Sequence, residues 1–441
     1  MFNDTIVALS TAPFESALAL IRMSGKEAHK ILRNIFSVPI SEDQGPQIIH
    51  GQIINDGEVI DDVVVNLTKA PKTFTGEDTV EISCHGNLVI INKIIEACIK
   101  FGARLAEKGE FTKKAFINGK IDLIQAESIN DLIRANSESA VKVALQGLKG
   151  SVSNKIKDLK NDLLDIISQI EVNIDYPEYE DIEQLTNKIL LPRIKILSEK
   201  SSKILEEAET GQMIRDGIKV AIVGKPNAGK SSLLNALLEE EKAIVTDIAG
   251  TTRDIVEGRI IIGGLPFLFL DTAGLRNPTN KIESLGVERS KKAISEADII
   301  INVIDASKTG QKIETGIKKK PHIIVLNKKD IGIKSKIEGI SISALKKDNI
   351  EELKKAIVKK TGIELKEYDQ YALLSNTRQI GLMQKAKRAL EDASLSCKKM
   401  VPVDLIYIDL RLALDALLEI LGEKSNIDLD NEVFSRFCVG K

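Results

Sequence analysis

The chain has 441 residues with 62 Lys and Arg against 64 Asp and Glu, a formal net charge of −2. This length predicts two to three domains, and the near-neutral charge excludes a bulk positive field, so any nucleic-acid partner must be held by local basic patches. The four widely spaced cysteines form no C-x-x-C pair, which excludes a disulfide framework and indicates a reducing, cytoplasmic location. No apolar run approaches the ~18 residues of a membrane-spanning helix, so no membrane association is expected.

Residues 1–118 are predicted to form a mixed α/β domain. Helical spacing of apolar residues indicates helices at Lys26–Ile35 and Leu88–Ile99. The pair Cys84-His85 suggests half of a metal site, but such a site needs three or four ligands and no second pair lies nearby, so packing or a polar pocket is the preferred interpretation. Strand-like apolar runs occur at Thr5–Ser10, Ala17–Met23, Gly57–Leu67 and Thr79–Ser83.

Residues 119–215 switch to helical periodicity, and helical spacing returns from Asp369 to Leu421. Between them, residues 217–365 alternate strands and helices, which is typical of a parallel α/β sheet. We therefore expect a multidomain α/β plus all-α protein in which a nucleotide-type α/β domain is inserted into a helical bundle. The first helical segment is predicted to contain helices at Asp122–Ala135, Ser137–Ile174 and Leu185–Glu209.

A phosphate-binding loop begins the inserted domain. The apolar strand Val220–Val223 leads into Gly224–Ser231, which fits G-x-x-x-x-G-K-[ST], and then into the helix Ser232–Leu238. The glycines allow backbone N–H groups to surround phosphate oxygens, and the helix N-terminus adds a partial positive charge. Lys230 is expected to reach the outer phosphates, and the Ser231 hydroxyl is expected to bind Mg²⁺.

Two further motifs face the terminal phosphate. The strand Phe267–Leu270 runs into Asp271-Thr272-Ala273-Gly274, where Asp271 is placed to hold Mg²⁺ through water and Gly274 to donate an N–H. Upstream lies the threonine-rich loop Thr246–Asp254, in which Thr252 is expected to complete the Mg²⁺ shell when the γ-phosphate is bound.

The base specificity is predicted from Asn327-Lys328-Lys329-Asp330, which follows the apolar strand His322–Leu326. The Asp330 carboxylate can accept hydrogen bonds from N1–H and the exocyclic amine of guanine, whereas adenine offers neither in that arrangement. Ser343-Ala344, after the strand Gly339–Ile342, fits the last guanine-binding loop. Four motifs in this order predict a GTPase.

The sequence lacks the water-orienting glutamine of Ras-like enzymes, because Arg276 occupies its position two residues after Gly274. A bound monovalent cation, an arginine from a partner, or a nearby carboxylate could replace it. Asn227 is the candidate cation ligand and Glu283 the candidate water-orienting group. The three alternatives stay open on these residues alone.

The combined motifs resemble the MnmE (TrmE) family of tRNA-uridine-modifying GTPases. Besides the GTPase motifs, the resemblance rests on FTGEDTVEISCHG at Phe74–Gly86, GEFTKKAFINGKIDLIQAE at Gly109–Glu127 and the terminal Phe437–Lys441. It implies a folate-binding, dimerising N-terminal domain over residues 1–118 and a helical domain from residues 119–215 and 370–441. The inserted Ras-like GTPase domain would then span residues 216–369.

The resemblance also implies an activity. Members act as homodimers with the FAD-dependent MnmG (GidA) in a heterotetramer, and add aminomethyl or carboxymethylaminomethyl groups to C5 of wobble uridine 34 in tRNA. A tetrahydrofolate derivative (5-formyl- or 5,10-methylene-) supplies the one-carbon unit, and GTP hydrolysis is K⁺-dependent. The alternative is a GTP-gated ribosome-assembly factor without one-carbon chemistry, which we disfavour because aromatic residues make up only 4% and no RNA-binding module is visible. A third reading is a nucleotide switch that only regulates another enzyme.

Site residues carry over from the family by motif position. Folate contacts fall on Arg22, Glu81, Lys120 and Lys441; K⁺ ligands on Asn227, Thr246, Ile248 and Thr251; and Mg²⁺ ligands on Ser231 and Thr252. The catalytic candidates are Lys230, Glu283 and the terminal Cys438, whose role is either a low-pKa thiol or packing of the tail. The full set expected around GTP and its cations is Asn227, Ala228, Gly229, Lys230, Ser231, Ser232, Thr246, Asp247, Ile248, Ala249, Gly250, Thr251, Thr252, Asp271, Thr272, Ala273, Gly274, Asn327, Lys328, Asp330, Ser343 and Ala344.

Two departures from the family pattern are visible. The first-strand loop reads Thr11–Ser16 where the family often has a glycine-rich stretch, which puts the loop shape beside the expected folate pocket in question, and Val439 replaces the usual isoleucine. Lysine runs at Lys318–Lys320, Lys346-Lys347 and Lys398-Lys399 could contact tRNA phosphates, but solvated lysines are the simpler interpretation.

Overall fold

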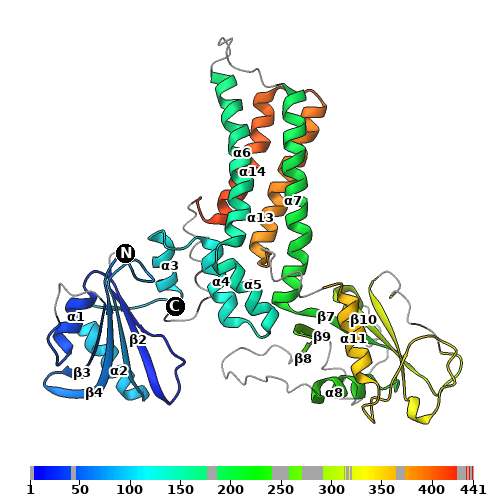
Figure 1. Ribbon diagram of the computed structural model, residues 1–441, viewed down its shortest axis with the longest axis horizontal. Coiled ribbons are helices and arrows are strands. Elements are labelled where there is room, and N and C mark those ends of the chain that lie inside the picture. Colours follow the sequence, from blue (N-terminus) through cyan, green and yellow to red (C-terminus); the bar gives the residue numbers. More distant parts are fainter. Residues whose placement is uncertain are drawn as a thin grey trace. The chain divides into compact units, whose positions relative to one another are not determined.

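The computed structural model describes residues 4–40, 46–175, 186–240, 258–270, 292–311, 313, 317, 320–363, 373–424, 434, 437 and 440. The chain divides into two compact units, Met1–Asn130 with Leu414–Lys441, and Asp131–Ala413. We describe each unit by itself (Figure 1). The domain boundaries expected near residues 118, 215 and 369 stay predictions.

A six-stranded sheet forms the centre of the first unit, in the order β3-β4-β5-β2-β1-β6. Neighbouring strands pair antiparallel except β1 and β6, which are parallel. All four strands predicted here are confirmed, and β3 and β6 are additional. The strands are β1 (Ile6–Leu9), β2 (Ser16–Ser24), β3 (Gln47–Asn55), β4 (Glu58–Thr68), β5 (Thr79–Gly86) and β6 (Arg104–Leu105).

The additional strands carry weak sequence signals. β6 is only two residues long, and β3 has Gly51 at its centre, a residue that weakens a strand pattern. The glycine is needed because a Cβ atom at this position would lie 2.7 Å from the ring of Phe36. A close approach between strand and side chain, which is a tertiary feature, therefore explains why local patterns did not indicate β3.

Alternating residues of the first sheet belong to two different hydrophobic clusters, one on each face of the sheet. Val7, Ile21 and Met23 pack with α1 (Ala28–Ile35) and α2 (Leu88–Lys100) in the larger core. Ile6 and Ala8, one residue out of phase, pack with Phe111 of α3 (Glu110–Ile117). The pleat therefore directs α3 to the opposite face of the sheet from α1 and α2.

Long helices of the second unit form a bundle in which α6, α7, α13 and α14 run side by side (Figure 1). The prediction of one continuous helix over Ser137–Ile174 is wrong. This segment is divided into α5 and α6 because the chain turns at Gly150, whose φ of 82° is left-handed. The helices that lie wholly in the second unit are α5 (Glu138–Leu148), α6 (Ser151–Asp175), α7 (Asn187–Asp216) and α13 (Thr377–Lys398), whereas α4 (Leu123–Arg134) and α14 (Val403–Leu421) each contribute residues to both units.

The second sheet has the order β12-β11-β10-β7-β9-β8, and only β8 pairs antiparallel. The predicted hairpin is confirmed, with its turn at Gly263-Gly264, where both φ angles are positive (59° and 80°). Helices α8 (Lys230–Glu240) and α11 (Ile350–Thr361) contribute to its core. The strands are β7 (Ile218–Val223), β8 (Gly258–Ile262), β9 (Leu265–Leu270), β10 (Ile299–Asp305), β11 (His322–Asn327) and β12 (Ile340–Ser341).

The topology of this sheet determines where a ligand can bind. β7 lies between β9 and β10, so the chain first continues from β7 to strands on one side of it and then passes from β9 to β10 on its other side. In open α/β sheets, ligands bind at such a switch point. Among the described helices, none is both long and apolar enough to span a membrane.

Candidate functional site

The phosphate-binding loop joins the carboxyl end of β7 to the start of α8, as predicted. Gly224 has a φ of 145°, and a Cβ there would lie 2.2 Å from the Val303 carbonyl oxygen on the adjacent strand. Gly229 has a φ of 92°, and Asn227 adopts a left-handed φ of 62° that asparagine tolerates. The loop therefore turns sharply against β10 and leads directly into the helix N-terminus, where an anion is favoured.

Lys230 extends back over the loop from the first turn of α8. Its Nζ donates hydrogen bonds to the carbonyl oxygens of Gly224 at 2.8 Å and Lys225 at 3.1 Å. The cation is thus held where the outer phosphates of a nucleotide would lie. Ser231 is half-buried and Ser232 exposed in the same turn of α8, consistent with a hydroxyl available to a cation.

Asn327 connects three of the predicted motifs. The side chain is buried at the end of β11, and its Nδ2 donates to the carbonyl oxygen of Ala228 in the phosphate loop at 3.0 Å. Its Oδ1 accepts from the backbone N–H groups of Lys328 at 2.8 Å and Ala344 at 3.0 Å. A Cβ at Gly229 would lie 2.1 Å from Asn327 Nδ2, so this glycine also makes room for the connection.

Lys328 forms a second connection to the phosphate loop. Its Nζ donates to the carbonyl oxygen of Asn227 at 2.7 Å and to Oδ2 of Asp305 at 2.8 Å. Asp305 is a residue that the sequence patterns missed, although its place at the end of the buried strand β10 was a usable signal. Burial alone would raise the pKa of this carboxyl, but hydrogen bonds from Lys328 and Ser307 bring it below its ordinary value.

The carboxylate that is predicted to recognise the base lies beside this network. Asp330 is exposed on the short 3₁₀ helix Lys329–Ile331. A hydrogen bond from the buried Ser343 side chain lowers the pKa of Asp330, and the charges of Lys346 and Lys328 act in the same direction. The carboxylate is therefore ionised and oriented, as an acceptor for two guanine N–H groups must be.

Several predicted residues lie outside the described part of the chain. For the threonine-rich loop, the aspartate loop, the water-orienting glutamate and the C-terminal tail, the roles assigned above stay predictions. These residues are Thr246, Asp247, Ile248, Ala249, Gly250, Thr251, Thr252, Asp271, Thr272, Ala273, Gly274, Glu283, Cys438 and Lys441.

A second polar cluster lies in the first unit, where β2 and β5 place Arg22 directly opposite Glu81. Glu81 Oε1 accepts from Arg22 Nε at 2.9 Å and lies 2.8 Å from Nη2, and Arg22 Nη1 donates to the Gly440 carbonyl oxygen at 3.4 Å. The guanidinium also lies 5.8 Å from the centre of the Phe111 ring. The structure thus brings two predicted folate contacts together, next to the residue that precedes Lys441.

The third described folate candidate, Lys120, has a different hydrogen-bond partner. Its Nζ donates to the carbonyl oxygen of Pro71 at 2.9 Å, so it is not shown to join the Arg22–Glu81 pair. Its stem packs near Gly76, where a Cβ would lie 3.4 Å from Lys120 Cγ. Gly76 also lines a nearby cavity, whereas Lys120 is not among the described residues that line it.

Sequence patterns missed a partly buried ion pair in this unit. The Nζ of Lys114 donates to Glu77 Oε2 at 2.8 Å and to the Asp4 carbonyl oxygen at 2.7 Å, and Ser24 Oγ also donates to Glu77 at 3.0 Å. Both charged residues occur in the family-specific stretches, which was the available signal. The pair borders a cavity of about 430 Å³ lined by Lys26, Ala70, Gly76, Glu77, Asp78, Lys114, Ile117 and Asn118.

His85 is hydrogen-bonded to Asp61, and the buried Cys84 also lies near this carboxylate. Asp61 Oδ1 lies 2.8 Å from His85 Nδ1, while its Oδ2 accepts from the His85 backbone N–H. Burial raises the pKa of the Cys84 thiol to about 11, and the nearby Asp61 charge acts in the same direction. Within the described residues, no group of three or more His, Cys, Asp or Glu side chains is arranged to hold a metal ion.

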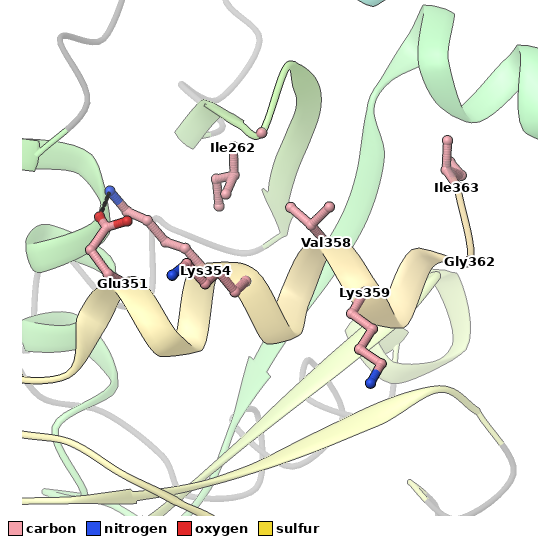
Figure 2. A pocket seen from close by; sticks show the side chains of 9 residues that line it. Ile262, Glu351, Lys354, Val358, Lys359, Gly362 and Ile363 are labelled. Atoms are coloured by element: carbon pink, nitrogen blue, oxygen red, sulfur yellow. Dashed lines mark ion pairs between the residues drawn. The ribbon is translucent and has the colours of Figure 1, made fainter. Parts of the chain in front are cut away.

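A further pocket of about 470 Å³ lies between the turn of the β8–β9 hairpin and α11 (Figure 2). Ile262 and Val358 point toward it, and Lys354 Nζ lies 2.9 Å from Glu351 Oε1 at its edge. None of the described residues that line it belongs to the predicted nucleotide motifs. We therefore expect the nucleotide at the carboxyl end of β7 and not in this pocket.

Comparisons with known proteins cover nearly the whole chain. The family described as "GTP-binding protein TrmE N-terminus" matches residues 5–120, and "MnmE helical domain" matches residues 123–438. The tRNA modification GTPase MnmE of Levilactobacillus brevis is 42% identical over 458 residues, covering 99% of this chain and 98% of that protein. The protein of the same name from Lactococcus lactis subsp. cremoris is 43% identical over 449 residues, with the same coverage.

The comparison with solved structures gives only weak similarities. The FeoB G-domain from Methanococcus jannaschii aligns with 33% of this chain and 97% of its own length, at 24% identity and a TM-score of 0.21. A TM-score that low does not establish a common fold.

Proposed function

The chain belongs to the MnmE family of tRNA modification GTPases, and we propose that it couples GTP hydrolysis to the addition of aminomethyl or carboxymethylaminomethyl groups at C5 of wobble uridine 34. In this proposal a homodimer acts on tRNA together with an FAD-dependent partner, and a tetrahydrofolate derivative supplies the one-carbon unit. The proposed location is the cytoplasm, in line with the buried, unpaired thiols of Cys84, Cys98 and Cys397.

The observation that carries the GTP-dependent part is the position of Asn327. Its side chain joins the Ala228 carbonyl to the backbone N–H groups of Lys328 and Ala344. Asp330, which would bind the base, and Lys230, which would bind the phosphates, therefore keep a fixed distance from each other before the nucleotide binds. This is preorganisation, which lowers the entropic cost of binding.

Two cations are part of the proposal. Ser231 and Thr252 would hold Mg²⁺, which neutralises phosphate charge, and Asn227, Thr246, Ile248 and Thr251 would hold K⁺ at the position that an arginine finger fills elsewhere. Of these ligands, the described Ser231 and Asn227 fit this role. Asn227 is an exposed oxygen donor at the bend of the phosphate loop, and Ser231 presents a hydroxyl in the first turn of α8.

The Arg22–Glu81 pair supports the folate part. A pterin offers adjacent N–H donors that suit a carboxylate, and the glutamate tail of a folate suits basic side chains. Arg22 and Glu81 are 17% and 26% exposed, so each charge is reachable although they already pair with each other. A folate would have to replace part of this pairing, with Lys120 and Lys441 as the further proposed contacts. When bound, the folate would supply the one-carbon unit.

Nucleoside analysis of tRNA from cells lacking this chain tests the proposed function. We expect the modified wobble uridine to disappear, and to return when the wild-type chain is supplied. Unchanged modification in the deleted strain would overturn the proposal, and a ribosome-assembly defect without a change in the tRNA would favour the alternative function.

A further inference from the structure

The turn of the β8–β9 hairpin is held by a helix of the bundle. Ser139, in the first turn of α5, donates its hydroxyl proton to the carbonyl oxygen of Gly264 at 2.7 Å, between residues 125 positions apart in the chain. Ser139 is only 4% exposed, so the bond is shielded from water. α5 and β9 lie side by side in the same unit (Figure 1). A buried hydrogen bond therefore joins α5 to the turn of the hairpin.

This hydrogen bond continues into the cap of α5. A carbonyl oxygen only accepts, so the proton of the Ser139 hydroxyl is directed to Gly264. Ser137 Oγ lies 3.1 Å from Ser139 Oγ and is therefore the donor in that pair. Ser137 is also the N-cap of α5, where its Oγ accepts from the backbone N–H of Ala140 at 3.1 Å. The hydroxyls that begin α5 thus form one chain of hydrogen bonds that ends on the hairpin.

The Gly264 carbonyl is available to Ser139 because the hairpin does not use it. Ile262 and Leu265 form the last pair of the β8–β9 ladder, and Gly263-Gly264 is the two-residue turn between them. The ladder ends at this flanking pair, so the carbonyl of a turn residue is not part of it. An unpaired carbonyl that is shielded from water costs free energy. Ser139 therefore supplies a partner that the turn itself lacks.

Apolar packing joins the same parts of the chain. Val143 lies one helical turn after Ser139, on the same side of α5. It belongs to the hydrophobic core that contains Leu265 and Phe267 of β9. Ile214, near the end of α7, belongs to this core as well. The bundle is therefore packed against β9 and its turn.

The start of β8 is held less closely. β8 is an edge strand of its sheet and pairs with β9. A cavity of about 350 Å³ lies between Arg259 of β8 and α5, where Ala140 and Val143 line it. Arg215 Nε lies 2.9 Å from Asp131 Oδ1, so this ion pair stays within the helices. The charged residues on the walls of the cavity are Asp131, Arg134, Arg215, Asp216 and Arg259.

The hairpin connects the two loops that are predicted to face the γ-phosphate. The loop Thr246–Asp254 precedes β8, and Asp271 directly follows β9. β9 also pairs with β7, which leads into the phosphate-binding loop. The position of the hairpin therefore determines where both predicted loops begin and end relative to the phosphates.

We propose that Ser139 is a positioning residue for GTP hydrolysis, which it affects through the Gly264 carbonyl and the β8–β9 hairpin. By fixing the turn, Ser139 fixes the spacing between the loops that are predicted to contain Thr252 and Asp271. The same bond transmits a change at the nucleotide to the bundle, because a displaced hairpin must either break the bond or move α5. This second part rests on the proposed coupling of hydrolysis to tRNA modification.

The test compares the full chain with its Ser139→Ala variant. We expect kcat for GTP hydrolysis to fall about tenfold, because a small misplacement of catalytic groups is costly. The affinity for a non-hydrolysable GTP analogue should change less than about twofold, because the contacts predicted for the base and the outer phosphates do not involve the hairpin. The matched control is Ser201→Ala on α7, a fully buried serine that donates to the Leu197 carbonyl of its own helix at 2.8 Å. Its kcat should equal that of the wild type.

Two further measurements separate positioning from a general loss of stability. Ser139→Thr keeps a hydroxyl and should restore most of the lost kcat. Hydrogen exchange of the α5 amides is then compared between the GDP-bound and the analogue-bound chain. We expect a difference between the two nucleotides in the wild type and in Ser201→Ala, and no difference in Ser139→Ala. All assays are made at a temperature at which circular dichroism shows every variant to be folded.

The possible outcomes separate this inference from the proposed function. A wild-type kcat in Ser139→Ala would overturn the positioning role, and so would equal losses in Ser139→Ala and Ser201→Ala. Unchanged nucleotide-dependent exchange of α5 in Ser139→Ala would overturn the transmission to the bundle. The proposed function is unaffected by these results. It fails if the wild-type chain does not hydrolyse GTP or if its deletion leaves the wobble uridine modified.

Discussion

The nucleotide motifs and the Arg22–Glu81 cluster are organised in different ways. Around the phosphate loop, Lys230, Asn327 and Lys328 bond mainly to backbone carbonyls and N–H groups, so the loops are held in place while the charged groups stay near the ligand position. Arg22 and Glu81 instead bond to each other. A nucleotide would meet a preorganised site, whereas a folate would have to compete with an existing ion pair.

Because of this difference, we expect the two sites to respond differently to mutation. Removing one member of the nucleotide network removes a ligand contact and also a connection between loops. Removing one member of the Arg22–Glu81 pair removes a ligand contact but also a competitor, so part of the loss is offset. The predictions below run from the largest expected effect to the smallest.

Lys230→Ala should have the largest effect. We expect kcat/KM for GTP hydrolysis to fall by about a hundred- to a thousandfold, because the variant loses the charge that faces the outer phosphates. Steady-state phosphate release measures the effect, with Lys219→Ala on β7 as the control that should retain activity. Loss of less than tenfold would mean that Lys230 only holds the loop.

Asp330→Asn should change which base is accepted. An amide offers one donor and one acceptor where guanine needs two acceptors, so GTP affinity should fall by about a hundredfold while affinity for xanthosine triphosphate rises. Competition with a fluorescent GTP analogue measures both values. Unchanged selectivity would remove Asp330 from base recognition.

Arg22→Ala should produce a smaller and separate effect. We expect binding of 5-formyl-tetrahydrofolate to weaken about tenfold, since a charged hydrogen bond is lost while Glu81 is released from its pair. GTP hydrolysis should be unchanged. Lys93→Ala, which removes an exposed ion pair with Glu58 in the same unit, is the control for nonspecific charge effects. Equal folate affinities for both variants would contradict the assignment.

The smallest effect concerns pH and Asp305. Because its folded-state pKa lies below the ordinary value, ionised Asp305 contributes stability above its unfolded pKa, and this contribution is lost as pH falls through the folded pKa. Asp305→Asn should lower the local opening free energy of β10 by about 1–3 kcal/mol at pH 7. The difference from wild type should shrink below about pH 4. Native-state hydrogen exchange measures it, and a difference that does not depend on pH would contradict the ionic contribution.

The features that could be predicted from the sequence are those whose geometry is local in the chain. The phosphate loop could be predicted because strand, glycines and helix start lie within one continuous stretch, and its geometry is local. The place of Asp305 at the end of a buried strand made it a candidate, but its role could not be assigned, because that role depends on the pairing of β10 with β11, which brings Lys328 to it. Likewise, the register that puts Arg22 opposite Glu81 joins residues that are far apart along the chain.

The helical segments show where periodicity alone fails. Apolar spacing continues through residues 137–174, but the left-handed turn at Gly150 ends one helix and begins another. Strand β3 was missed for a related reason, since Gly51 serves the packing of Phe36 and not the strand pattern. Gly51 serves tertiary packing and Gly150 a left-handed turn, and the spacing of apolar residues contains neither.

The most direct test of the account asks whether the two sites serve one reaction. A strain lacking this chain is supplied with the wild type, Lys230→Ala or Arg22→Ala, and wobble-uridine modification is quantified by mass spectrometry of tRNA nucleosides. We predict that the wild type restores modification, that Lys230→Ala does not, and that Arg22→Ala restores clearly less than the wild type although its GTP hydrolysis is normal. Full restoration by Lys230→Ala would contradict the claim that the GTPase site drives the modification.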